Sequence, residues 1–174
     1  MNPVRNTKNS KKENKISNGV KFILSPELGR LAKWLRILGF DAAYFSQTNF
    51  PSLLIQALRD NRIILTRNSH FIDKARAAKC VQIKNDEVNQ QLRQVLKDLN
   101  IRPDPEKMFS RCIICNTQLC EIEKQQVKDK VPEYVFKTQE EFFTCPSCRR
   151  IYWPGTHWGN VNKTLKEISD GIYC

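Results

Sequence analysis

The fold is decided by residues 20–40, whose sequence is VKFILSPELGRLAKWLRILGF. The first five of these residues form a short apolar run, which predicts a buried strand at 20–24. Ser25 followed by Pro26 predicts the start of a helix, with a side-chain cap and a proline in the first turn. Leucine and alanine then recur at helical spacing, and Gly39 predicts the end of this helix.

Strand and helix patterns continue to alternate after this unit. Short apolar runs predict further strands at 42–45, 62–66 and 80–84. An amphipathic stretch follows each of these runs and predicts a helix there. The repeated alternation predicts an α/β fold, in which a parallel sheet carries helices on its faces.

Two cysteine pairs beyond residue 110 predict a metal site. The pairs are Cys112-Ile-Ile-Cys115 and Cys145-Pro-Ser-Cys148, and 29 residues separate them. Two residues between cysteines let one tight turn aim both thiolates at a single ion, and four thiolates complete a closed tetrahedral shell. We therefore expect structural zinc in a C-terminal ribbon, held by Cys112, Cys115, Cys145 and Cys148.

Other uses of these cysteines fit less well. A thioredoxin-like redox pair needs a single Cys-x-x-Cys at a strand-to-helix turn, and catalytic zinc normally keeps one position open for water. Cys120 or His157 could replace one of the four ligands. The long spacer predicts elements of its own, a short helix near 121–130 and a strand at 134–137.

The chain is strongly basic, with a net charge of +11 over 174 residues. Its first 21 residues hold six basic residues and one acidic residue among asparagines and serines, which predicts a disordered tail. A basic chain with such an arm favours a nucleic-acid partner, because phosphate contacts supply most non-specific affinity. No apolar run has the length of a membrane helix and no secretory signal stands out, so we expect a soluble, cytoplasmic protein.

Five segments are expected along the chain. They are a disordered basic tail (1–19), the α/β domain (20–100), a linker (101–110), the zinc ribbon (111–160) and a C-terminal helix or tail (161–174). The two prolines of the linker and the first cysteine pair set the boundary between the α/β domain and the ribbon.

Aromatic residues follow the second cysteine pair. Tyr152, Trp153 and Trp158 lie shortly after Arg149 and Arg150, so they could stack on bases while the arginines contact phosphates. They could also form the small core of a ribbon that the metal staples together. We favour the core interpretation, because such a module has little else to pack.

The carboxyl ends of the predicted strands are the place to look for a catalytic site, because open parallel sheets bind ligands there. A magnesium- or manganese-dependent nuclease needs several carboxylates at this edge. The sequence offers Glu27 and Asp86, while Ser25 and Asn68 are polar and uncharged. Glu27 and Asp86 are therefore the candidate catalytic acids.

Three groups of motifs carry a resemblance to a known family. The first is Phe22-Ile-Leu-Ser-Pro-Glu-Leu-Gly-Arg-Leu-Ala-Lys-Trp-Leu-Arg-Ile-Leu-Gly-Phe-Asp41, and the second is Ile64-Leu-Thr-Arg-Asn68. The third combines Arg111-Cys112, Val131-Pro-Glu-Tyr-Val135 and Tyr152-Trp-Pro-Gly-Thr-His-Trp158. Over about residues 20–160 the chain resembles the Mut-seven C-terminal ribonuclease domain family. The resemblance implies a PIN-like α/β fold followed by a C-terminal zinc ribbon, bound zinc and a role with RNA.

The chain departs from the family pattern at acidic positions. The resemblance implies aspartates where this chain has Ser25 and Asn68, and an acid near the start of the second helix, where residues 49–52 are NFPS. Aspartate supplies the negative charge that retains magnesium or manganese, and serine and asparagine do not. We therefore expect little metal-dependent cleavage.

Three classes of function remain open from the sequence. As a ribonuclease, the protein would hydrolyse RNA with Glu27, Asp86 and bound magnesium or manganese. As a binding module, it would hold RNA without cutting it, and as a scaffold it would bind proteins, for which the sequence names no partner. Arg30, Lys33 and Arg67 are the candidate phosphate contacts. His70 is a further candidate for a general base.

Overall fold

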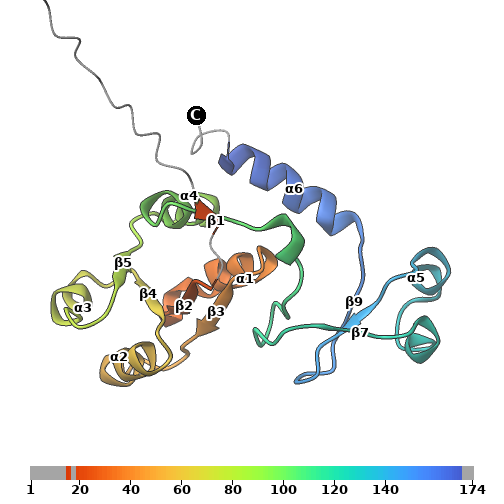
Figure 1. Ribbon diagram of the computed structural model, residues 1–174, viewed down its shortest axis with the longest axis horizontal. Coiled ribbons are helices and arrows are strands. Elements are labelled where there is room, and N and C mark those ends of the chain that lie inside the picture. Colours follow the sequence, from red (N-terminus) through yellow and green to blue (C-terminus); the bar gives the residue numbers. More distant parts are fainter. Residues whose placement is uncertain (1–14, 17–18, 170–174) are drawn as a thin grey trace, which may run out of the picture.

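A four-stranded parallel sheet forms the centre of the N-terminal part of the protein, as the computed structural model of residues 15–16 and 19–169 shows (Figure 1). The strand order is β3-β2-β4-β5. The strands are β2 (Lys21–Leu24), β3 (Asp41–Tyr44), β4 (Ile63–Thr66) and β5 (Cys80–Gln82). The predicted α/β fold with a parallel sheet is confirmed.

Helices cover both faces of this sheet (Figure 1). They are η1 (Pro26–Leu28), α1 (Gly29–Ile37), α2 (Phe50–Arg59), α3 (Ser69–Lys74) and α4 (Val88–Asp98). Successive residues of β2 point to opposite faces, so Phe22 packs in the core under α1 and α4, while Ile23 packs in the core under α2 and α3. Burial on both faces explains why the predicted strands are continuously apolar.

The turn after α1 needs the glycine that the sequence places there. Gly39 has a φ angle of +85°, a conformation that is costly for residues with a Cβ. A Cβ at this position would also lie 2.3 Å from the backbone oxygen of Lys107. The end of the helix therefore fits closely against the segment that leads to the cysteines.

The C-terminal part is an antiparallel ribbon with short helical insertions. Its sheet has the order β7-β8-β9, formed by β7 (Cys120–Glu121), β8 (Phe143–Thr144) and β9 (Ile151–Tyr152). The insertions are η3 (Lys124–Val127) and α5 (Glu133–Thr138). Val127, Val135 and Phe142 are buried at the centre of the ribbon.

The strand predicted at 134–137 is wrong, because these residues belong to helix α5. Pro132 precedes the helix as its N-cap residue, and Glu133 Oε1 pairs with Lys137 Nζ at 2.6 Å, one turn later. The helix also places Val135 in the ribbon core, and such packing overrides the strand propensity of the aromatic and β-branched residues. The helix predicted near 121–130 is reduced to the short turn η3.

The remaining elements connect the two parts. β6 (Ile101–Arg102) and η2 (Pro105–Lys107) occupy the predicted linker, and β6 pairs in parallel with β1 (Lys15–Ile16). The sequence predicts a disordered tail over 1–19, and the structure differs from this prediction at Lys15–Ile16, which form β1. Residues 1–14 and 17–18 lie outside the described residues.

Helix α6 (Thr156–Ser169) returns from the ribbon and packs against α4 (Figure 1). Among the described helices, none has the length and apolar character that crossing a bilayer requires.

Candidate functional site

Glu27 lies at the carboxyl edge of the parallel sheet, where three donors meet one of its oxygens. Its Oε1 accepts hydrogen bonds from Ser25 Oγ at 2.5 Å, from the Arg67 backbone nitrogen at 2.9 Å and from Thr66 Oγ1 at 3.2 Å. Ser25 and Thr66 close β2 and β4 and are fully buried. The carboxylate therefore ties together the ends of two neighbouring strands.

Ser25 does not cap the helix as predicted. Its backbone stands at the N-cap position of η1, but its side chain makes no capping hydrogen bond and donates to Glu27 instead. The acceptor carboxylate two residues along is a stronger partner for the hydroxyl than a neutral backbone group would be.

The hydrogen bonds set the protonation of Glu27. Burial raises the pKa of this carboxyl, but hydrogen bonds from Ser25, Arg67 and Thr66 outweigh burial and hold the pKa below its usual value. Glu27 is therefore charged at neutral pH, and this charge is directed at donors of its own chain.

The lowered pKa of Glu27 predicts stability that depends on pH. Glutamate in an unfolded chain has a pKa of about 4.3, so this stabilisation is complete above that pH and is lost as pH falls through the lower folded pKa. We expect the urea midpoint to fall with pH in this window, and Glu27→Gln to remove part of the dependence. Glu141→Gln, an exposed ribbon residue, is the control. Identical pH profiles for wild type and Glu27→Gln would contradict this role.

The other predicted residues of the sheet edge have separate partners. Asn68 is the N-cap of α3, where its Oδ1 accepts a hydrogen bond from the Phe71 backbone nitrogen at 3.2 Å. Asp86 pairs through Oδ1 with Arg67 Nη2 at 2.5 Å, and its side chain is 82% exposed. Asp86 thus contacts the side chain of Arg67, while Glu27 contacts its backbone. His70 is exposed on the first turn of α3.

The carboxylates of this edge do not assemble into a metal site. Within residues 19–169, the one group of three or more histidine, cysteine or acidic residues placed to hold an ion is the cysteine cluster. Thr66 and the backbone of Arg67 are partners of Glu27 that sequence reasoning missed. Thr66 lies 39 residues from Glu27, so its only signal is its place at the end of the third predicted strand.

The four cysteines of the ribbon come together. Their Sγ atoms all lie within 4.8 Å of one another, with Cys112 and Cys148 at 3.6 Å and Cys115 and Cys145 at 3.3 Å. A tetrahedral ion with metal–sulfur bonds of about 2.3 Å needs sulfur atoms about 3.8 Å apart. The cluster therefore fits one such ion. Cys120 is exposed on β7 outside the cluster, and the side chain of His157 is outside the described residues.

Hydrogen bonds to sulfur outweigh burial and lower the pKa of Cys112 and Cys115 in this cluster. At Cys148 a backbone hydrogen bond from Arg150 is outweighed by burial and the facing thiols, which raise the pKa to about 11. The backbone nitrogens of Cys115 and Cys148 point at Cys112 Sγ and Cys145 Sγ, at 3.5 and 3.4 Å. Burial raises the pKa of Cys115, but hydrogen bonds with Thr117 and with the facing thiols outweigh burial and lower the pKa to about 5. Thiolates are the form that binds metal.

A buried arginine joins the first cysteine turn to the α/β part. Arg36 of α1 is 5% exposed, and its Nη1 donates to the carbonyl oxygens of Ile113 and Ile114 at 2.9 and 2.7 Å. Its Nε donates to the Ala42 carbonyl oxygen on β3 at 2.8 Å. Arg36, which belongs to the α/β part, thus supplies hydrogen-bond donors to the carbonyl oxygens of the two residues between Cys112 and Cys115.

Asn116 makes a second connection between the two parts. Its Oδ1 accepts from the Ala42 backbone nitrogen at 2.9 Å, and its Nδ2 donates to Asp41 Oδ1 at 2.7 Å. Burial raises the pKa of Asp41, but hydrogen bonds from Arg62 and Asn116 outweigh burial and lower the pKa. The ribbon is therefore held to the edge of β3 by specific polar contacts.

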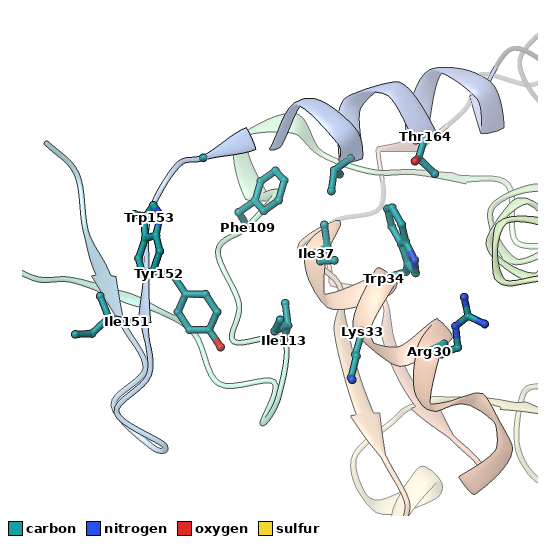
Figure 2. A pocket seen from close by; sticks show the side chains of 12 residues that line it. Arg30, Lys33, Trp34, Ile37, Phe109, Ile113, Ile151, Tyr152, Trp153 and Thr164 are labelled. Carbon is teal, nitrogen blue, oxygen red and sulfur yellow. The ribbon is translucent and has the colours of Figure 1, made fainter. Parts of the chain in front are cut away.

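A cavity of about 680 Å³ lies between α1, β9 and α6, where the two parts meet (Figure 2). Arg30 and Lys33 line it from α1, apart from Arg67 at the sheet edge. The predicted phosphate contacts are therefore divided between two places. Tyr152 and Trp153 form the opposite wall, and Trp153 also packs partly against the ribbon core.

A parallel α/β domain with a four-cysteine ribbon is the class of protein that this fold and site define. A comparison with known families matches the Mut7-C RNAse domain over residues 20–165, and the chain belongs to this family. No curated protein matches the sequence.

Proposed function

We propose that this protein binds RNA and is a poor metal-dependent ribonuclease, with zinc as a structural ion. Membership of the Mut7-C RNAse domain family supports RNA as the ligand. The observation that carries the proposal is the state of Glu27, whose Oε1 accepts from Ser25, Thr66 and Arg67 rather than facing other carboxylates. The alternative, a ribonuclease that uses Glu27 and Asp86 as its catalytic acids, has less support because Asp86 pairs with Arg67.

Magnesium or manganese does not fit the residues present at the sheet edge. Such ions prefer several hard oxygen ligands, and here the Glu27 carboxylate accepts from hydroxyl and backbone donors while Asp86 pairs with Arg67. Asn68 uses its side-chain oxygen to cap α3. The edge therefore repels an RNA backbone less than a cluster of acids would.

Zinc fits the cysteine cluster. Four thiolates at tetrahedral spacing would hold it as a closed site with no position for water, so its contribution is to folding rather than chemistry. Tyr152, whose hydroxyl oxygen lies 3.1 Å from Cys112 Sγ, would donate a further hydrogen bond to the thiolate.

The test of RNA binding is its dependence on salt. We expect affinity for a labelled single-stranded RNA to fall steeply with salt, because each phosphate contact releases counterions. Deleting residues 1–14, which removes four basic residues and one acidic residue and leaves β1 in place, should flatten the log–log slope by about 2. The measurement is fluorescence anisotropy across a potassium chloride series. RNA affinity that is unmeasurable at low salt would contradict the proposal and favour a protein scaffold.

A further inference from the structure

Two hollows share one wall made of the ribbon. The first is the cavity between α1, β9 and α6, and the second is a hollow of about 540 Å³ beside β9, lined by Lys130 and by the arginines that follow the second cysteine pair. Ile113, Ile151, Tyr152 and Trp153 line both of them. Figure 2 shows Tyr152 and Trp153 on one side of the cavity, the α1 side chains on the other, and Phe109 and Ile113 between them. The two hollows therefore adjoin each other at the four residues that line both, and together they make up one surface feature at β9.

Positive charge lies at both ends of this feature. Arg30 and Lys33 line the first hollow, and Lys130, Arg149 and Arg150 line the second. Among the described residues that line either hollow, none is acidic, and none of these five cations forms an ion pair with a described carboxylate. A polyanion crossing the ribbon would meet cations before and after the aromatic wall.

The centre of the feature is aromatic and held in place. Trp34, Phe109, Tyr152 and Trp153 line the first hollow, and each is partly exposed. Tyr152 is fixed through its hydroxyl by Cys112, and Trp153 by the ribbon core. Rings held in this way are stacking platforms, because every nucleobase has a flat apolar face.

We propose that this feature is a track for single-stranded RNA, with one unstacked base in the first hollow and phosphates on the cations at both ends. The proposal rests on the RNA binding proposed above and says which surface of the protein the RNA strand would follow. Arg30 follows Glu27 by three residues, so the α1 end of the track is close in sequence to the sheet edge. A duplex cannot use the track, because its bases are stacked and paired.

The first test needs only the wild-type chain. Affinities are compared for a labelled twelve-residue uridylate strand and for an abasic strand with the same number of phosphates. We expect the strand with bases to bind about tenfold more tightly, as one base stack predicts. Fluorescence of Trp34 and Trp153 should be quenched by the strand with bases and not by the abasic strand. Equal affinities and equal quenching would overturn the track.

The second test uses matched charge changes. Arg149→Gln combined with Arg150→Gln should weaken binding at least tenfold more than Lys74→Gln combined with Arg76→Gln, which removes the same charge near α3. Equal losses in the two double variants would show that only total charge matters and would overturn the track. Trp153→Phe, which keeps a ring, should retain more affinity than Trp153→Ala at equal zinc content.

The outcomes separate the track from RNA binding itself. Salt-dependent binding of RNA with no preference for bases overturns the track and leaves RNA binding in place. Absence of measurable binding to any RNA strand at low salt overturns both. Tighter binding of the strand with bases, together with weaker RNA binding by the Arg149 and Arg150 double variant, supports both the track and RNA binding.

Discussion

Replacing Cys112 or Cys148 with serine is expected to reduce bound zinc from one ion per chain to nearly none and to unfold the ribbon. Each substitution removes one of four sulfur atoms that lie within 4.8 Å of one another. Structural zinc sites contribute about 10–16 kcal/mol in apparent binding free energy, which the small core around Val127, Val135 and Phe142 cannot replace. The α/β part should stay folded, because its two cores are built mainly from its own strands and helices.

The measurements are elemental analysis of protein purified without added metal, and circular dichroism with limited proteolysis. Cys120→Ser is the matched control, since Cys120 is exposed and outside the cluster, and it should keep its zinc. Chelation of the wild type should reproduce the serine variants. Soluble, folded wild-type protein with a metal content near zero would contradict the assignment.

Wild-type protein is expected to cleave labelled RNA at background rate across a manganese titration. Combining Ser25→Asp with Asn68→Asp should create manganese binding and gain cleavage. Aspartate at position 25 would bring a second carboxylate beside Glu27, where Ser25 Oγ now lies 2.5 Å from it. Without metal the two like charges would repel and lower stability, and an ion between them would relieve this repulsion. Asn68→Asp should leave the start of α3 intact, because aspartate caps helices about as well as asparagine.

The readouts for this double variant are RNA cleavage and the shift in melting temperature with manganese. Binding at ten times the dissociation constant stabilises a folded protein by about 1.4 kcal/mol, so the shift is visible even without cleavage. Ser25→Ala combined with Asn68→Asp is the control, since it adds only one carboxylate. Robust metal-dependent cleavage by the wild type, abolished by Glu27→Gln or Asp86→Asn, would show that the site is an active nuclease.

Local patterns predicted the elements that local interactions decide. The apolar run before Ser25 and the glycine at position 39 predicted β2 and the end of its following helix, because burial and a positive φ angle act within a few residues. The cysteine pairs predicted the cluster for the same reason, since each turn is self-contained. Residues 134–137 have strand propensity, but as a helix they place Val135 in the ribbon core, a packing contact that the local pattern does not show.

Long-range contacts could not be predicted. The donors to Glu27 on Thr66 and Arg67 lie 39 and 40 residues along the chain, so the sequence could not show that the carboxylate is already engaged. The cavity has walls from α1, from the segment before the first cysteine, from β9 and from α6. No sequence pattern records that Arg30 and Trp153 line the same space.

The buried guanidinium of Arg36 has a consequence for how the molecule melts. It donates to β3 on one side and to the two carbonyls of the first cysteine turn on the other, and Asn116 bridges the same boundary. Opening the boundary would exchange these hydrogen bonds for bonds to water, at a net cost of about 0.5–1.5 kcal/mol for each. A ribbon that holds its zinc would therefore stabilise the α/β part across this boundary, and loss of the ribbon should lower the melting temperature of the α/β part while leaving it folded.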